Sequence, residues 1–493
     1  MQRWHVTVGL VGLALTAAVF APRLFGGAFS TPPVPPVVSV PPVPPLVVIP
    51  EVAPVATVST SDHGHLKLDA GLDRSAVIAG ATSERFIVIN VTAPDDMGTS
   101  VRRPVDIAVA MDVSGSMTGE GKIDYARRSA GYLVDHMEPG DSYALVAFSD
   151  EANVKIPAGP VRDAQSLRAQ IDRIYEGGGT NIGDGLNTSA AEALRASNGE
   201  NAPRVVLLSD GNPTVGVQDA DALARIVGDI HAKGVTVSVV GLGLDYNEDL
   251  LQRLADAGGG SYDFVDDPTE LQTVFSEELR KSQSVVAHRT TVSVGWDGAS
   301  GIELLDVVGW DERGWVADCP NTLCEVGFSV DMGDMYAGQT RKIVARVRVS
   351  APREGGELKL ASVNLGYDDV IDGAPGNAAR IVVATGTQDV AVVDKSLDRD
   401  RTKGAAMAWG NEQSQLAARA YADGNIAEAE EYAKKGESWF GYNATLLGGD
   451  ADLQMRAERT EQMRNTMPTV SPSAPAARRV VMQAKEDYLN DAR

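Results

Sequence analysis

Asp112, Ser114 and Ser116 place one carboxylate and two hydroxyl groups at two-residue intervals along the chain. They directly follow the apolar residues 105–111, which predict a buried strand that delivers these side chains at its carboxyl end. Gly115 permits a tight turn because it has no Cβ to clash, so the three side chains can face one small space. Oxygen ligands without sulfur or imidazole favour Mg²⁺, Mn²⁺ or Ca²⁺ over zinc and copper.

Two more oxygen donors stand in comparable positions. Thr180 ends the glycine-rich residues 177–179 and precedes residues 182–196, whose spacing of apolar side chains predicts a helix. Asp210 follows the apolar residues 205–208, which predict a second buried strand. In an open α/β sheet the carboxyl ends of parallel strands lie at one edge, where ligands bind. We therefore expect the five side chains to converge at this edge.

The segments around these loops predict a doubly wound, mostly parallel sheet of the α/β class. Short apolar stretches alternate with amphipathic stretches of helical spacing, which is the pattern of βα units. Helices are predicted at residues 122–136, 164–174, 182–196, 220–232, 249–257 and 268–282, and strands at residues 105–111, 143–148, 205–208, 235–240 and 261–265.

The five oxygen-bearing positions together resemble the metal-ion-dependent adhesion site of von Willebrand factor A (VWA) domains, over residues 104–284. The matching residues are Asp112, Ser114, Ser116, Thr180 and Asp210. The resemblance implies a Rossmann-like fold and a bound divalent cation, Mg²⁺ or else Ca²⁺ or Mn²⁺. In this family the hydroxyls reach the ion directly or nearly so, while the carboxylates often act through water. An ion held mainly by neutral hydroxyls keeps much of its charge, so the resemblance implies a protein partner that presents an Asp or Glu.

Composition restricts the class of partner. The chain has 67 acidic and 44 basic side chains, a net charge of −23, and no run of basic residues interleaved with aromatics. This excludes a nucleic-acid-binding surface. The negative charge concentrates cations but opposes a strongly acidic partner, so one acidic residue on a neutral or basic surface fits better.

The regions that flank the α/β segment predict an antiparallel β-sandwich into which that segment is inserted. The predicted strands are residues 65–72, 83–93, 285–294, 302–308, 323–328, 341–349 and 358–367. Residues 334–340 are similar to β-rich regions that follow the A domain in bacterial members of the VWA family. Those regions distantly resemble inter-alpha-trypsin-inhibitor heavy chains and calcium-activated-channel-like proteins.

Residues 402–466 are alanine-rich and have helical spacing. Within them, residues 417–433 predict a helix, a tight turn and a second helix, and resemble a single tetratricopeptide-like hairpin. One hairpin cannot bury both of its faces, so we expect this one to pack on the sandwich or on a partner.

The N-terminus predicts export. Arg3 precedes the uncharged residues 6–20, a length that is typical of a signal peptide and short for a membrane span. Ala21 favours cleavage and Pro22 hinders it, so a cleaved signal and an uncleaved membrane anchor both remain open. Either one predicts a periplasmic, cell-surface or secreted protein.

Cys319 and Cys324 are the only cysteines. The four residues between them can form the tight loop that a disulfide requires, and export favours oxidation. A pair of reduced thiols is the alternative. A zinc site is disfavoured because further Cys or nearby His ligands are missing from the sequence around this pair.

The expected organisation has seven parts. These are a signal peptide or anchor, a proline-rich linker, the first sandwich strands, the VWA domain, the rest of the sandwich, the helical hairpin and a flexible tail with a short helix, at residues 1–25, 26–60, 61–103, 104–284, 285–400, 401–466 and 467–493.

Three functions are compatible with these features. The leading one is an exported, non-enzymatic, adhesion-type module that binds a partner carboxylate through the cation. The second is an accessory or assembly subunit of an envelope complex, which docks through the helical hairpin. The third is a metal-dependent hydrolase, which ranks last because only the ligand carboxylates could act as a general base near the site. His63 and His65 could lie on one face of a strand and bind a metal, but exposed positions in a polar linker are favoured, and His136, His231 and His288 are scattered and expected at the surface.

Overall fold

The computed structural model describes most of the chain beyond residue 57. The described residues are 58–95, 104–138, 140–197, 203–242, 247–265, 271–297, 301–310, 326–351 and 355–471, together with 481, 483 and 484. The chain divides into two units, Met1–Pro50 and Glu51–Arg493, and every described residue belongs to the second. The predicted signal segment, most of the proline-rich linker and the pair Cys319 and Cys324 lie outside the described residues.

The α/β domain is built on one six-stranded sheet. Its strands are β5 (Asp106–Asp112), β6 (Ser142–Phe148), β7 (Ala152–Pro160), β8 (Pro203–Ser209), β9 (Thr236–Leu242) and β10 (Gly259–Val265). They lie in the order β10-β9-β8-β5-β6-β7, and all run parallel except the edge strand β7. Strands β5, β8 and β9 are buried along their whole length. The predicted mostly parallel sheet is confirmed.

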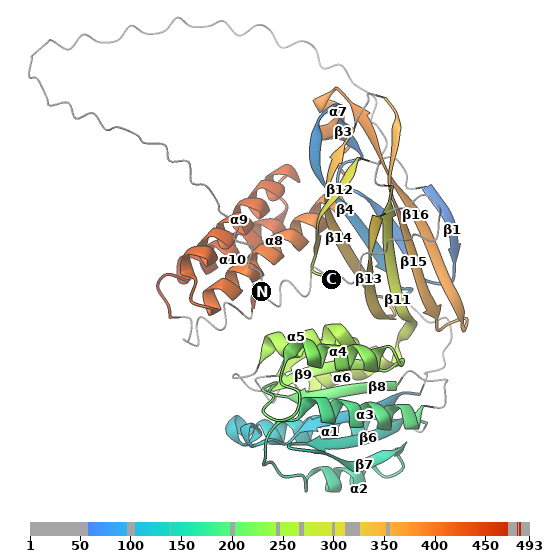
Figure 1. Cartoon of the computed structure of the whole chain (residues 1–493), viewed down its shortest axis with the longest axis vertical. Helices are drawn as coiled ribbons and strands as arrows, with labels where there is room; N and C mark the ends of the chain where they lie inside the picture. Colours follow the sequence, from blue (N-terminus) through green and yellow to red (C-terminus); the bar gives the residue numbers. More distant parts are fainter. Residues whose placement is uncertain are drawn as a thin grey trace, which may run out of the picture. The chain divides into compact units, whose positions relative to one another are not determined.

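Helices cover both faces of this sheet (Figure 1). They are α1 (Lys122–His136), α2 (Ala164–Ile171), α3 (Ile182–Ala196), α4 (Ala220–His231), α5 (Glu248–Gly258) and α6 (Leu271–Gln283), with a 3₁₀ helix η1 (Gly115–Gly121) before α1. Leu133 of α1 and Phe275 of α6 belong to the core on one face. Leu186 of α3 and Leu254 of α5 belong to the core on the other face. Two buried cores thus hold the strand ends in fixed positions.

Two antiparallel sheets form the sandwich. Its strands are β1 (Val58–His63), β2 (Lys67–Leu72), β3 (Ala76–Ile78) and β4 (Thr82–Thr92) before the α/β domain, and β11 (Val285–Trp296), β12 (Ile302–Val308), β13 (Val326–Tyr336), β14 (Thr340–Ser350), β15 (Glu357–Asp369) and β16 (Ala374–Thr387) after it. One sheet has the order β1-β16-β15-β11-β13, with β3 beside β16, and the other has the order β12-β14-β4-β2. Strand β4 pairs with β14 from Thr82↔Ser350 to Thr92↔Thr340. Strands on either side of the inserted domain therefore share one sheet, as predicted.

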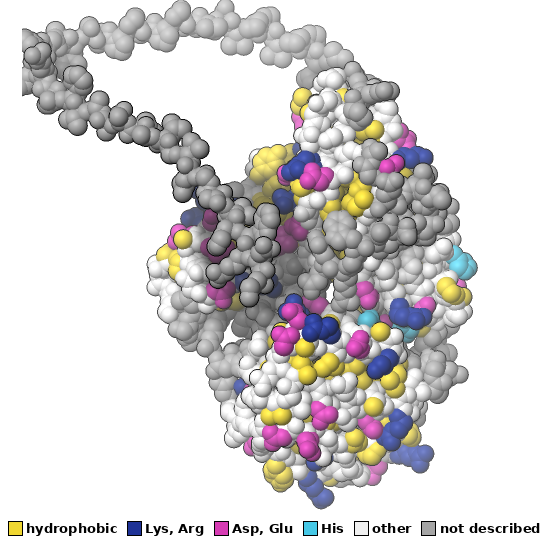
Figure 2. Space-filling model, in the orientation of Figure 1, with side chains coloured by type: hydrophobic (Ala, Val, Ile, Leu, Met, Phe, Trp, Pro, Cys, Tyr) yellow, Lys and Arg dark blue, Asp and Glu magenta, His cyan; other side chains and the backbone are white. Residues whose placement is uncertain are grey.

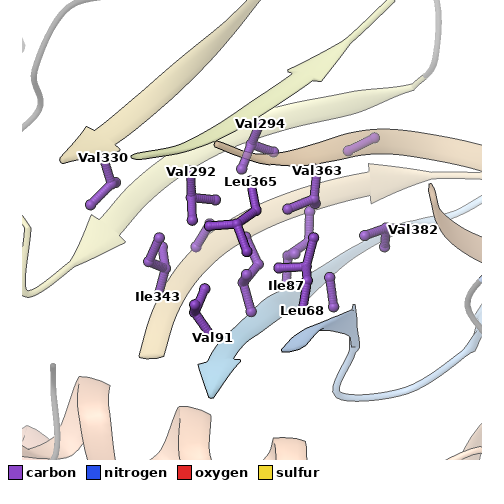
Figure 3. Close-up of a cluster of buried hydrophobic side chains, with 14 of the residues drawn as sticks. Leu68, Ile87, Val91, Val292, Val294, Val330, Ile343, Val363, Leu365 and Val382 are labelled. Carbon is purple, nitrogen blue, oxygen red and sulfur yellow. The ribbon is translucent and has the colours of Figure 1, made fainter. Parts of the chain in front are cut away.

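Aliphatic side chains from the two sheets meet in the interior of the sandwich (Figure 3). Fully burying one such side chain contributes about 1.5–3 kcal/mol. The labelled members are Leu68, Ile87, Val91 and Ile343 from one sheet, and Val292, Val294, Val330, Val363, Leu365 and Val382 from the other.

The C-terminal region contains more helices than the predicted hairpin. They are α7 (Val390–Lys395), α8 (Arg399–Ala422), α9 (Ile426–Leu446) and α10 (Ala451–Thr466). The predicted tight turn between α8 and α9 is present, and Gly424 there has a φ of +82°. Ala405 and Ala408 of α8 pack against Phe86 and Val344 of the sandwich. The expectation of packing on the sandwich is therefore confirmed for α8, whereas the long helix α10 is an addition to the hairpin.

None of the described helices combines the length and the apolar character that crossing a bilayer would need. On the face shown in Figure 2, acidic and basic side chains are interspersed over the α/β domain, without a continuous basic patch among the described residues.

The expectation that His231 is a surface residue is wrong, whereas His288 is partly exposed. His231 is 9% exposed, and its Nε2 lies 3.8 Å from Asp331 Oδ2. His288 Nδ1 lies 2.8 Å from Asp334 Oδ1, a buried carboxylate. His231, at the end of α4, thus contacts β13 from the α/β domain, whereas His288 joins β11 to β13 within the sandwich.

A buried polar cluster joins the α/β sheet to β13. Arg204 of β8 donates through Nη2 to Asp334 Oδ2 at 3.3 Å and to Tyr336 Oη at 3.2 Å. Thr236 of β9 donates its hydroxyl to Asp334 Oδ2 at 2.7 Å. Arg204 and Asp334 are each 3% exposed. The carboxylate of Asp334 is thus the common acceptor of groups from two strands of the α/β sheet and from His288 of β11.

Glu412 makes the contact between α8 and the sandwich sensitive to pH. Burial raises the pKa of Glu412 to about 7 from an ordinary 4.5; nearby Asp306 raises it further, and Arg346 opposes the shift. The folded state therefore holds a proton that the unfolded state releases, and stability falls as the pH rises from about 4.5 through 7. We expect Glu412→Gln to change stability little at pH 5 and to stabilise the protein by about 1–2 kcal/mol at pH 8.5, measured by urea unfolding. Equal effects at both pH values, or an equal effect of Glu458→Gln on the exposed side of α10, would contradict this.

Candidate metal centre

Asp112 is the last residue of β5 and is completely buried. Its Oδ1 accepts the Ser114 N–H at 2.9 Å, and its Oδ2 accepts the Ser209 hydroxyl at 2.5 Å. The first bond holds the turn that follows β5, and the second ties this turn to the end of β8. The carboxylate is therefore fixed between two of the three loops that the sequence singles out.

Ser114 and Ser116 are adjacent in space, as their two-residue spacing predicts. Their Oγ atoms lie 3.0 Å apart. Ser114 is buried at the N-cap of η1, where no side-chain hydrogen bond caps the helix, and Ser116 is exposed. One hydroxyl thus lies at the floor of the site and the other at its rim.

The glycine-rich loop is fastened to the first loop through the backbone. Gly115 N–H donates to Gly178 O at 3.0 Å, and Gly177 N–H donates to Val113 O at 2.7 Å. Gly178 has a φ of +91°, a left-handed conformation that favours glycine, and a Cβ there would lie 2.6 Å from Asp150 Oδ2.

Thr180 follows this loop and is 2% exposed. Its N–H donates to the Thr214 hydroxyl at 2.8 Å, and its carbonyl oxygen accepts the N–H groups of Thr214 and Val215. The next residue, Asn181, caps α3 by accepting the Asp184 N–H, so the helix begins directly behind Thr180. These contacts involve only the backbone of Thr180. Its hydroxyl takes part in none of them.

Asp210 follows β8 and is 1% exposed. Its Oδ2 lies 3.2 Å from Lys122 Nζ, in an ion pair of two buried groups. Its Oδ1 is buried and has no hydrogen-bond partner among the described residues. Gly211 behind it has a φ of +70°, and a Cβ there would lie 2.7 Å from Leu251, so the turn requires glycine.

The donor set fits a hard divalent cation. Two buried carboxylates, Asp112 and Asp210, lie at the ends of the neighbouring strands β5 and β8. Burial raises the pKa of Asp112 to about 6, and the charge of Asp210 raises it further. Hydrogen bonds from Ser114 and Ser209 act in the opposite direction and lower this pKa. A buried acceptor without a donor, Asp210 Oδ1, costs free energy unless a cation or a water satisfies it. Carboxylate and hydroxyl oxygens are ligands that Mg²⁺, Mn²⁺ and Ca²⁺ prefer.

Sequence reasoning missed two members of this centre. Ser209 is not among the predicted ligands, although its hydroxyl binds Asp112. Lys122 is not among the predicted site residues either, since a lysine at the start of a helix is usually solvated. Its place shortly after Ser116 was the available signal, since the short helix η1 brings it back over the loop.

Lys122 carries a positive charge next to a predicted metal ligand, so it should oppose the cation. We expect Lys122→Met to tighten Mg²⁺ binding by about tenfold, because it removes this repulsion while Asp210 keeps both oxygens. Lys122→Arg keeps the charge and should leave the affinity nearly unchanged. Isothermal titration calorimetry measures both. Weaker binding by Lys122→Met would instead show that the lysine holds Asp210 in its binding position.

A second group of potential ligands consists of His65, Asp369 and Asp372. Its central carboxylate, Asp369, already accepts hydrogen bonds from groups of the chain itself. Asp369 Oδ2 accepts the N–H of His65 at 2.8 Å and lies 3.0 Å from His65 Nδ1. Asp369 Oδ1 accepts the N–H groups of Ile371 and Asp372 at 2.8 and 3.1 Å. Asp369 therefore stabilises the turn after β15 rather than offering free lone pairs.

Comparisons with known proteins agree with this geometry. Residues 106–277 match the family model of the von Willebrand factor type A domain. The chain is 27% identical over 235 residues to the uncharacterized protein YfbK of Escherichia coli (strain K12), which covers 48% of this chain and 40% of the relative. It is 28% identical over 230 residues to inter-alpha-trypsin inhibitor heavy chain H4 of Homo sapiens, which covers 43% of this chain and 24% of that protein. The matches span about a quarter to a half of the length of these curated relatives.

Two solved structures share the fold over most of the chain. A von Willebrand factor type A protein from Catenulispora acidiphila superposes with a TM-score of 0.62 at 18% identity, covering 85% of this chain and 92% of that chain. The ArnB paralog VWA2 from Sulfolobus acidocaldarius gives a TM-score of 0.55 at 17% identity, covering 86% and 99%. At these identities the similarity shows the fold alone.

Proposed function

Because residues 106–277 form a von Willebrand factor type A domain, we propose that this chain is an exported, non-enzymatic binding module that grips a partner protein through a divalent cation. VWA domains typically mediate protein–protein interactions. The observation that supports the metal-dependent form of this role is the buried, unpartnered Oδ1 of Asp210 at the sheet edge where Asp112, Ser114 and Ser116 also lie.

Five side chains would hold the ion, which we propose to be Mg²⁺, with Ca²⁺ or Mn²⁺ as alternatives. They are Asp112, Ser114, Ser116, Thr180 and Asp210. When bound, the ion supplies a positive charge that attracts an oxygen ligand from outside the chain. Ser116 is exposed, so a carboxylate of a partner can approach the centre from its side. The export part of the proposal depends on the sequence of residues 1–25.

A hydrolytic role has less support. A metal-activated water requires a nearby group that takes a proton. Asp112 has both oxygens engaged by Ser114 and Ser209, and Asp210 is paired with Lys122. Asp112 therefore has no unengaged oxygen to take a proton, and the unpartnered oxygen of Asp210, Oδ1, is the proposed ligand of the ion, which favours binding over catalysis.

The accessory-subunit alternative uses the C-terminal helices as a docking surface. Tyr442 of α9 is 60% exposed and would lie within such a surface. Removing α8 as a whole is an unsuitable test, because α8 covers Phe86 and Val344 of the sandwich. A single substitution on the exposed side of α9, Tyr442→Ser, is the suitable probe.

Partner capture from an envelope extract tests the proposal. With the full chain as bait, we expect one protein to be retained in Mg²⁺, released by EDTA, and lost with Thr180→Ala but retained with the control Thr445→Ala on α9. Retention that survives both EDTA and Thr180→Ala would contradict the proposal. Loss on Tyr442→Ser without sensitivity to EDTA would favour the accessory-subunit role.

A further inference from the structure

A cavity of about 520 Å³ lies beside the candidate metal centre. Val113 and Gly177 line it, and these two residues are joined by a backbone hydrogen bond of 2.7 Å. Val113 stands between Asp112 and Ser114 in the first loop, and Gly177 begins the loop that ends at Thr180. The cavity and the metal centre are therefore built on the same two loops.

The lining of the cavity is basic. Lys155 on β7 and Arg173 after α2 both line it, and both are exposed. Within the described part of the chain, neither side chain forms an ion pair with a carboxylate. Glu176 also lines the cavity and lies 3.7 Å through Oε2 from Nη2 of Arg127, which pairs through Nη1 with Asp124 at 3.0 Å as well. The cavity thus offers two cations that form no ion pair among the described residues, beside one carboxylate that shares Arg127 with Asp124, in a chain of net charge −23.

The remaining lining groups can bind a carboxylate and its backbone. Asn153 and Gln170 provide side-chain amides, and Tyr175 is 75% exposed with Arg127 5.4 Å from its ring centroid. Arg127 also donates to Ile174 O at 2.8 Å through Nε. The segment that carries Tyr175 is therefore held in place from α1, so this wall of the cavity is supported before any ligand binds.

From this arrangement we propose that the partner presents an acidic, extended segment with two acidic residues. One carboxylate binds the cation, and a second Asp or Glu of the same segment enters the cavity and pairs with Lys155 and Arg173. This inference rests on the proposed function, and it specifies the partner further. Because the centre and the cavity share the loops of Val113 and Gly177, the second acid should lie close to the first along the segment.

The cations of the cavity modify the expectation that the net negative charge of the chain opposes an acidic partner. The overall charge of −23 disfavours a partner that is acidic over a wide surface. Coulombic interactions between exposed charges fall off within about 8 Å at physiological ionic strength, so the two nearby cations dominate at the cavity. A short acidic segment on an otherwise neutral or basic protein satisfies both conditions.

Selection from a library of random linear peptides displayed on phage tests the proposal. The full chain is immobilised in Mg²⁺, and bound phage are released with EDTA and sequenced. The test variant carries Lys155→Gln and Arg173→Gln. The matched control carries Lys233→Gln and Arg225→Gln, two exposed cations on the same domain that do not line the cavity. A selected peptide and its single-acid derivative are then synthesised and titrated against all three proteins.

The wild type and the control variant should select peptides with two acids close together in sequence, whereas the test variant should select peptides with one. The two-acid peptide should bind the test variant about five- to tenfold more weakly than the wild type, and the single-acid peptide should bind both equally. EDTA-released peptides with one acid from all three proteins would overturn the inference and leave the proposed function intact. A wild type that yields no EDTA-releasable peptide would instead contradict the proposed function.

Discussion

Asp112→Asn is expected to weaken Mg²⁺ binding by about 100-fold or more, because it removes one of the two carboxylate charges of the centre. Asparagine is the conservative choice, since its Oδ1 can still accept the Ser114 N–H and its amide can still bind Ser209. The loss should therefore come from charge and donor chemistry rather than from a collapsed loop. Isothermal titration calorimetry with MgCl₂ measures the change, and near-ultraviolet circular dichroism checks that the fold is kept.

The matched control is Asp229→Asn, which removes an exposed carboxylate from α4. It changes the net charge by the same amount and should leave the Mg²⁺ affinity nearly unchanged. An affinity for Asp112→Asn within about threefold of the wild type would show that this carboxylate does not contribute to a metal site.

Asp334→Ala is expected to produce the largest loss of stability, about 3–5 kcal/mol at pH 7. Burial alone would raise the pKa of Asp334, but the hydrogen bond and charge of His288, the charge of Arg204 and the hydroxyl of Thr236 outweigh it and hold the pKa well below its usual range. Alanine leaves the 3%-exposed Arg204 without this carboxylate in the buried cluster between β8 and β13. The midpoint of the first unfolding transition should move to a lower urea concentration.

The pH dependence of this effect follows from the sign of the shift. The depressed pKa means that the folded state binds fewer protons than the unfolded state, so the stabilisation is present above about pH 4 and is lost as the pH falls further. The difference between wild type and Asp334→Ala should therefore shrink in acid. As a control, Asp368→Ala removes an exposed carboxylate paired with Arg289 and should cost less than about 1 kcal/mol. A loss of that small size for Asp334→Ala would contradict a stabilising role for the cluster.

The α/β domain was predictable because its strands are continuous apolar segments and its functional residues follow them directly. Strand β5 is buried at every position, so its sequence pattern is unambiguous. The edge strand β7 was missed because Pro157 and Pro160 argue against a strand, although proline is tolerated at a sheet edge. Here the neighbouring strand β6, rather than local propensity, determines the structure.

The sandwich and the C-terminal helices were predicted less completely. Strand β1 is polar and strand β3 has only three residues, so neither has a clear alternating pattern. Strand β16 begins with Ala, Pro, Gly and Asn, which are poor strand formers. Strand β13 continues past Asp331 to Tyr336 through Gly333, whose φ of +66° allows a break in register. Helix α10 has few apolar residues, so its periodicity is weak, and it is positioned by burying Leu453 and Met463.

The candidate centre was predictable as a set of oxygen donors but not as a network. The motif identifies Asp112, Ser114 and Ser116, and the structure places the two hydroxyls 3.0 Å apart. The contacts of Lys122 with Asp210 and of Ser209 with Asp112 depend on which side chains the folded sheet brings together. Such pairings between distant segments have no signature in local spacing.

Anomalous diffraction from crystals of the full chain soaked in Mn²⁺ tests the central claim most directly. We expect one strong peak at the carboxyl edge of the α/β sheet, within about 2–3 Å of the hydroxyls of Ser114 and Ser116, with Thr180, Asp112 and Asp210 around it. A peak only at His65, Asp369 and Asp372, or a clean map around β5 and β8 at saturating Mn²⁺, would contradict it.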